Sequence, residues 1–107
     1  MPKDQLRATA PALNPIANLE FMPVLSKFYG IVIRMLFAQP LRAHFHAIYE
    51  DSELVVGINP LRIMNGSAPF RARAMVLEWA ALHEEELQAA WHRVSHAQPP
   101  ARIAPLP

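Results

Sequence analysis

The sequence predicts an α+β domain in which a small antiparallel sheet of about four to five strands carries one long C-terminal helix on one face. Two observations predict it. From Val24 to Met64, runs of β-branched and aromatic residues alternate with short turn signals. From Ala68 to Ser95 the chain is rich in helix-forming residues, with no glycine or proline after Pro69. Hairpin-connected strands followed by a helix form a two-layer arrangement.

The first half of the predicted sheet lies on either side of a Gly30 bend. A short strand is expected at Val24–Phe28, and the next at Ile31–Phe37. Every second residue of the longer run is apolar and is expected to face the core: Ile31, Ile33, Met35 and Phe37. Arg34 then points to the opposite face, and Gln39-Pro40 ends the run because proline cannot donate to a strand ladder.

The second half begins with Ala43–Tyr49, which has the most informative alternation. Phe45, Ala47 and Tyr49 share the face expected to point inward, while His44, His46 and Ile48 share the outer face. A return strand is expected at Glu53–Ile58, with Leu54, Val56 and Ile58 inward. A short edge strand at Leu61–Met64 then ends at an Asn65-Gly66 turn signal.

The helix is expected to begin after an N-cap at Ser67 and to end before Pro99-Pro100. One stripe at helical spacing is mostly apolar and includes His83, flanked by Trp79: Val76, Ala80, His83, Leu87, Ala90, Trp91 and Val94. Residues 1–21 contain three prolines and few large apolar groups, which favours an N-terminal arm. The predicted organisation is therefore an arm at 1–21, a single domain at 22–98 and an extended tail at 99–107.

Composition excludes several classes of site. The 107 residues contain no cysteine, which rules out disulfides, thiolate zinc sites and cysteine nucleophiles. The net charge of +1 gives no general attraction to nucleic acid or to anionic membranes. No apolar run has the length of a membrane span or of a signal-peptide core, so a cytoplasmic protein is expected. No sequence motif indicates a cofactor.

Four blocks, in order, carry a family likeness: MPVLSKFYGIVIRM, AHFHAIY, MVLEWAALHEEELQAAW and the IAPL of the tail. Together they resemble a family of small bacterial proteins known as the domain of unknown function number forty-one sixty. The resemblance runs from Met22 almost to the C-terminus and leaves out residues 1–21. It implies a short cytoplasmic protein, often encoded beside another small protein, in a toxin–antitoxin-like setting.

His44, His46 and Arg34 form the first candidate site. On the predicted outer face, two imidazoles and a guanidinium stand close enough to act on a phosphodiester. In a metal-independent ribonuclease mechanism, one histidine would take the proton of the 2′-hydroxyl and the other would protonate the leaving oxygen. Arg34 would stabilise the phosphorane.

A metal site is the second alternative. Residues two apart on a strand share a face and lie about 7 Å apart, so His44 and His46 could bind one divalent ion. His83 is the obvious third ligand, but the predicted phasing puts it against the core face of the sheet. A register change of one residue would be needed to bring the three together.

An interaction module is the leading interpretation. The outer face carries more apolar residues than a solvated sheet needs, which predicts a homodimer or a small protein partner over it. The family likeness extends this expectation to one half of a toxin–antitoxin-like pair. Ribonuclease activity, with RNA as the partner, and metal binding through histidines remain the alternatives.

Overall fold

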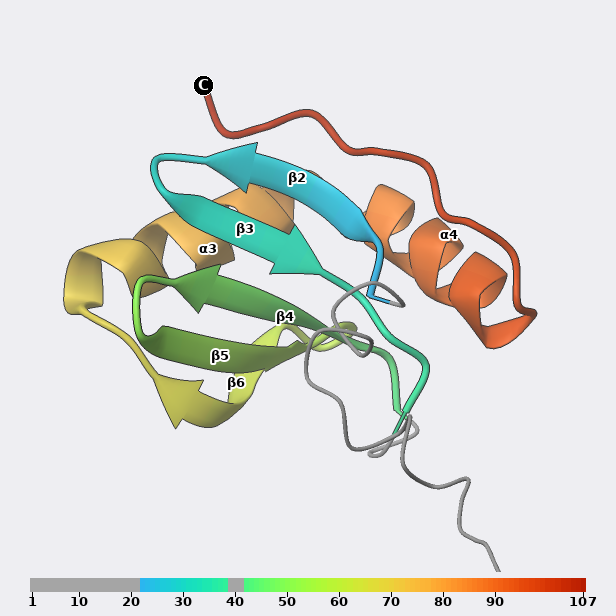
Figure 1. Ribbon diagram of the computed structural model, residues 1–107, viewed down its shortest axis with the longest axis horizontal. Helices are drawn as coiled ribbons and strands as arrows, with labels where there is room; N and C mark the ends of the chain where they lie inside the picture. Colours follow the sequence, from blue (N-terminus) through green and yellow to red (C-terminus); the bar gives the residue numbers. More distant parts are fainter. Residues whose placement is uncertain (1–21, 39–41) are drawn as a thin grey trace, which may run out of the picture.

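The computed structural model describes residues 22–38 and 42–107, which form one antiparallel sheet and two helices (Figure 1). The sheet has five strands in sequence order, β2-β3-β4-β5-β6. These strands are β2 Val24–Phe28, β3 Ile31–Arg34, β4 His44–Tyr49, β5 Ser52–Gly57 and β6 Arg62–Ser67. The predicted α+β class and antiparallel sheet are confirmed. The expected arm at 1–21 and the Gln39-Pro40 strand end lie outside the described residues.

Tight turns set the strand register. Tyr29 and Gly30 join β2 to β3, and both have positive φ (49° and 80°), as a two-residue type I′ turn requires. Glu50 and Asp51 join β4 to β5, with Glu50 at φ 52°. The resulting pairs form rows that cross all five strands, and two of these rows carry the residues of the face away from the core. One row is Lys27, Val32, Ile48, Glu53 and Ser67, and the other is Val24, Arg34, His46, Val55 and Asn65.

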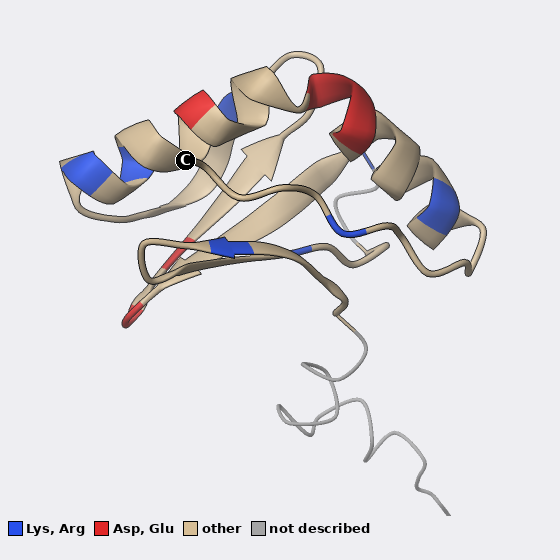
Figure 2. Ribbon diagram, turned by 90° about the horizontal axis from the view of Figure 1, so that it is seen from above, with Lys and Arg blue, Asp and Glu red and all other residues tan. Residues whose placement is uncertain are grey.

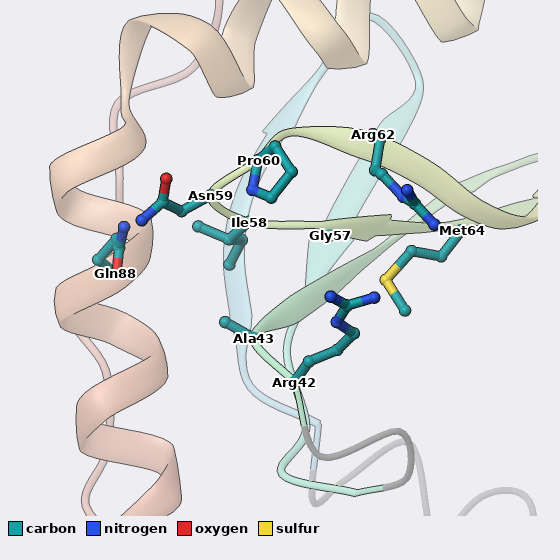
Figure 3. Close-up of a pocket in the computed structure, with 9 residues that line it drawn as sticks. All are labelled: Arg42, Ala43, Gly57, Ile58, Asn59, Pro60, Arg62, Met64 and Gln88. Carbon is teal, nitrogen blue, oxygen red and sulfur yellow. The ribbon is translucent and has the colours of Figure 1, made fainter.

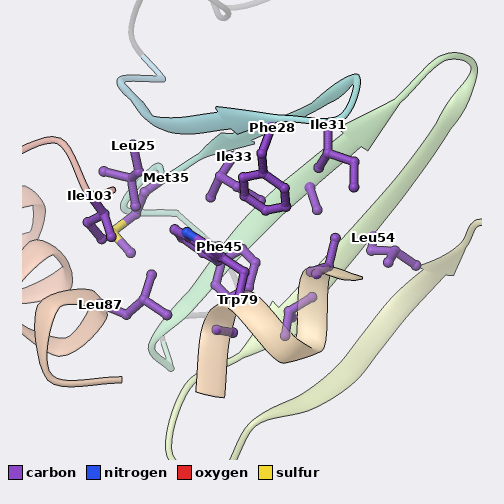
Figure 4. Close-up of a cluster of buried hydrophobic side chains, with 14 of the residues drawn as sticks. Leu25, Phe28, Ile31, Ile33, Met35, Phe45, Leu54, Trp79, Leu87 and Ile103 are labelled. Atoms are coloured by element: carbon purple, nitrogen blue, oxygen red, sulfur yellow. The ribbon is translucent and has the colours of Figure 1, made fainter. Parts of the chain in front are cut away.

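The inner face of the sheet packs against the helices, as the alternation predicts. Phe45 and Ala47 are buried, while Tyr49 is half-buried at the rim of the core. Trp79 lies at the centre of this core with its ring 5.4 Å from Phe28 and 5.8 Å from Phe45 (Figure 4). The predicted inward residues of the return strand are also buried: Leu54, Val56 and Ile58.

The prediction of one long helix is wrong. The segment forms α3 Phe70–Leu82 and α4 Glu84–Ser95, separated by His83 at φ −127° and ψ 31°. The His83 N–H donates to the Ala80 carbonyl, which closes the first helix, and the His83 carbonyl accepts from Leu87 in the second. The break redirects the chain so that both helices lie over the same face of a twisted sheet (Figure 2).

Three local expectations are also wrong. Ser67 is the last residue of β6 and not a helix cap, because α3 begins at Phe70 after Pro69. Asn65-Gly66 does not turn the chain, because β6 runs through it with a bulge opposite Val55 and Val56. Phe37 is 46% exposed, because β3 ends at Arg34 and the alternation does not continue to position 37.

The last residues run extended beside β2. The Ile103 N–H donates to the Leu25 carbonyl at 2.8 Å, and Trp79 Nε1–H donates to the Ala104 carbonyl at 2.8 Å. Ile103 and Leu106 are buried, so the tail contributes to the core. Within the described parts of the chain, no helix is long and apolar enough to cross a membrane.

Candidate functional site

The two histidines of β4 lie on the same side of the strand, and the centres of their rings are 5.3 Å apart. His46 is partly accessible, with 17% of its side chain exposed. His44 is completely buried, and its ring lies 5.1 Å from the Trp91 ring of α4. The strand parity is therefore as expected, but only one of the two imidazoles reaches the surface.

His44 is held as a neutral imidazole. Its Nδ1 lies 2.8 Å from the Arg42 carbonyl, which can only accept, so Nδ1 carries the proton. Its Nε2 is left as a buried acceptor with no hydrogen-bond partner. Burial lowers the pKa of His44 below its usual 6.5, and His46 lowers it further, against the opposing effect of the hydrogen bond to Arg42. His44 is therefore uncharged at neutral pH.

His46 forms a pair with Glu53 on the neighbouring strand. Its Nδ1 lies 2.8 Å from Glu53 Oε2; the carboxylate can only accept, so Nδ1 donates and Nε2 is the ring nitrogen left for another partner. Arg34 is the register partner of His46 on the other side, in β3. Its Nη1 donates to the Met22 carbonyl at 2.6 Å, which holds the guanidinium beside the strand end.

The site thus offers one accessible base and one guanidinium. Cleavage of a phosphodiester by two histidines requires both imidazoles to reach the same substrate. His46 can do so through Nε2, whereas the ring of His44 has no exposed surface. The arrangement therefore supplies half of the predicted acid–base pair.

His83 lies apart from these two residues, in the break between the helices. Its Nδ1 contacts Glu86 Oε1, and its ring packs 5.5 Å from Trp79 in the core beneath the sheet. Among residues 22–38 and 42–107, no three histidine, aspartate or glutamate side chains are grouped so that they could hold a metal ion.

A pocket at one end of the sheet contains residues that the sequence analysis did not single out. It has a volume of about 280 Å³ and lies between the ends of β4, β5 and β6 and helix α4 (Figure 3). Arg42 and Arg62 enter it from two sides, and Gln88 reaches it from α4. These residues are brought together by strand register and helix placement, for which the sequence carries no periodic or motif signal.

A family model for a domain of unknown function, DUF4160, matches residues 30–92, which is more than half of the chain. The chain belongs to the DUF4160 family. The resemblance drawn from the sequence blocks is thereby confirmed. The DUF4160 match includes the His46 site and the whole arginine-lined pocket, but not β2 or the C-terminal tail. No curated protein and no solved structure matches the chain.

Proposed function

We propose that this protein is a protein-interaction module whose uncovered sheet face pairs with a second copy of the chain. Both helices lie on one side of the sheet, although Trp91 of α4 packs on His44 at the start of β4. Figure 2 shows no helix over the rest of the other face. We call this second surface the outer face and define it by the two cross-strand rows given above, without Val24: Lys27, Val32, Arg34, His46, Ile48, Glu53, Val55, Asn65 and Ser67.

The charge pattern of the outer face carries the proposal. Across one row, Val32 and Ile48 sit at the centre, with Lys27 on one side and Glu53 on the other. A twofold axis running along the strands between β3 and β4 would stack Val32 on Ile48 of the second copy. The same axis would place Lys27 opposite Glu53, twice in the dimer. Such self-complementarity is what an isologous interface requires.

The partial burial of three outer-face residues is consistent with this use. Val32 and Ile48 of one row and Val55 of the other are half-buried within the single chain, and we call these three residues the apolar strip. A second sheet packed about 10 Å away would remove this strip from water. The ribonuclease alternative has less support, because it needs a second accessible imidazole and His44 is buried.

Light scattering across a dilution series tests the proposal. A dimer that survives dilution to low micromolar concentration is expected. Ile48→Glu places a charge at the centre of the interface and should yield a monomer. Leu82→Glu is the matched control, because Leu82 is 62% exposed on the helical side, and it should leave the dimer intact.

A charge exchange makes the test specific to this geometry. Lys27→Glu and Glu53→Lys should each weaken the dimer by placing like charges opposite one another. The double variant should recover most of the lost affinity, since the pairs are restored with opposite sign. A chain that is monomeric at all concentrations, or a double variant weaker than both single variants, would contradict the proposal.

A further inference from the structure

We propose that the pocket lined by Arg42 and Arg62 binds the phosphate group of a small phosphate ester. We call it the arginine pocket, lined by Arg42, Ala43, Gly57, Ile58, Asn59, Pro60, Arg62, Met64 and Gln88. This inference goes beyond the proposed dimer and does not depend on it.

Strand register brings the two arginines together. Gly57 at the end of β5 pairs with His44 at the start of β4 on one side and with Arg62 at the start of β6 on the other. Arg42 precedes His44 by two residues, so both guanidinium groups emerge at the same end of the sheet. In Figure 3 they approach Met64 from two sides of the pocket.

No described residue engages either guanidinium. Arg42 and Arg62 are exposed, and neither forms a side-chain hydrogen bond or an ion pair with residues 22–38 or 42–107. Within the same residues, no aspartate or glutamate lines the pocket. The Glu50-Asp51 turn lies at the opposite end of β4 and β5, six residues of strand away. Two guanidinium groups that no described side chain pairs, beside a cavity whose described lining holds no carboxylate, favour an anion.

Guanidinium groups select phosphate by geometry as well as by charge. Each presents a planar fork of N–H donors that matches two oxygens of a phosphate or carboxylate. Two such forks supply at least four donors, which suits the three terminal oxygens of a phosphate monoester better than the two oxygens of one carboxylate. The arginines therefore favour a phosphate monoester.

The rest of the pocket accommodates more than the phosphate. Asn59 and Gln88 lie near one another at the end away from the guanidinium groups, and both carry amides that can donate and accept (Figure 3). Gly57 and Pro60 lie between the two ends, and Met64 lies at the arginine end. The volume of about 280 Å³ is close to the lower limit of small-molecule sites, roughly 300 Å³. The ligand is therefore a small organic phosphate with a polar group opposite the phosphate.

Gly57 lines the pocket, and its lack of a side chain leaves room beside Met64 and Pro60. A Cβ at this position would lie 3.0 Å from Met64 Sδ and 3.6 Å from the Pro60 carbonyl. A side chain at position 57 would therefore require Met64, which also lines the pocket, to shift. Gly57→Ala accordingly tests the shape of the pocket without removing a charge.

Isothermal titration calorimetry on the full chain tests the site. The probes are a nucleoside 5′-monophosphate, a pentose 5-phosphate, inorganic phosphate and the unphosphorylated nucleoside. We expect one of the two esters to bind more tightly than inorganic phosphate, and the nucleoside not to bind. The tighter ester identifies the ligand as a nucleotide or a sugar phosphate.

Variants connect the binding to the arginines. Arg42→Gln and Arg62→Gln should each weaken ester binding at least about tenfold, since a charged hydrogen bond is lost. Arg71→Gln is the matched control and should leave binding unchanged. Arg71 is also exposed and pairs with no side chain of the described part of the chain, but it lies on α3 outside the pocket. Thermal melts confirm that each variant is folded.

Several results would overturn the inference. One is that neither ester binds the folded protein at millimolar concentration. Another is equal weakening by Arg71→Gln and by the two pocket variants, which would indicate charge attraction without a site. A third is ester binding that Arg42→Gln and Arg62→Gln both leave unchanged.

Discussion

Replacing Gly66 by alanine should destabilise this protein far more than the same change at Gly30. Both glycines have positive φ, 87° at Gly66 and 80° at Gly30. A Cβ at Gly66 would lie 2.0 Å from the Glu53 carbonyl oxygen, which is backbone and cannot rotate away. A Cβ at Gly30 would lie 3.4 Å from the Tyr49 ring, an ordinary van der Waals contact. Both variants therefore lose stability because alanine disfavours positive φ, but only Gly66→Ala also brings a Cβ into steric overlap with the backbone of a neighbouring strand.

The magnitudes follow from these geometries. An alanine held at positive φ costs about 1–2 kcal/mol relative to glycine, and this applies at both positions. At Gly66, β6 must also move away from β5 near Leu54, which loses about two backbone hydrogen bonds worth roughly 1 kcal/mol each. The expected destabilisation is about 3–4 kcal/mol for Gly66→Ala and about 1–2 kcal/mol for Gly30→Ala.

Urea unfolding followed by tryptophan fluorescence measures both free energies. For a domain of this size, the larger value corresponds to a fall in Tm of roughly 12–30 °C. A Gly66→Ala protein that fails to fold while Gly30→Ala folds would agree with the argument. Equal destabilisation by the two substitutions would refute it, because the close approach of β6 to the Glu53 carbonyl would then carry no energetic weight.

Two further predictions concern buried polar groups. Because the pKa of His44 is lowered in the folded state, the unfolded chain takes up the proton first as the pH falls through about 6.5, and stability is lost below that pH. In urea titrations from about pH 8 to about pH 5.5, His44→Phe should reduce the change of the unfolding free energy with pH. The same measurement on His92→Gln, at an exposed position, should show the full change. An unchanged pH dependence in His44→Phe would contradict this prediction. Trp79→Phe removes the donor to Ala104 and should lower stability by about 1–3 kcal/mol while accelerating hydrogen exchange at the Ile103 amide. Trp91→Phe serves as its control, and slower or equal exchange at Ile103 in the Trp79 variant would count against the tail contact.

Strand alternation predicted the inner face of the sheet because period-two patterning is set locally. Phe45 and Ala47 point into the core as expected, and His46 lies on the other face. The same argument could not predict the burial of His44. Trp91 covers the His44 ring. Trp91 lies 47 positions later in the sequence, and its location depends on where the helix breaks.

The helix break itself had no local signal. The segment contains no proline or glycine between Phe70 and Ser95, and helix propensity favours a continuous element. Trp79 in α3 and Leu87 in α4 are both fully buried, so each helix packs its own apolar residue into the core on its side of the break. Tertiary packing therefore overrides propensity at His83.

The Asn65-Gly66 pair correctly predicted a residue with positive φ, but the prediction that the chain turns there was wrong. Gly66 does adopt positive φ, but inside a bulged strand, where the chain continues along β5.

The arginine pocket could not be predicted from the sequence for a related reason. Arg42 and Arg62 are 20 residues apart, and only the registers of β4 and β6 with β5 bring them to the same end of the sheet.

The C-terminal residues 103–107 lie beside the edge strand β2 and protect it from pairing with other chains. An outermost strand leaves a row of unpaired amides and carbonyls to which a foreign strand can add. On β2, the Leu25 carbonyl already accepts from the Ile103 N–H, and in the turn that follows β2, Tyr29 donates its hydroxyl to the Pro107 carbonyl at 2.8 Å. Removing residues 103–107 would expose the edge of β2, where strands of other chains could add and cause aggregation.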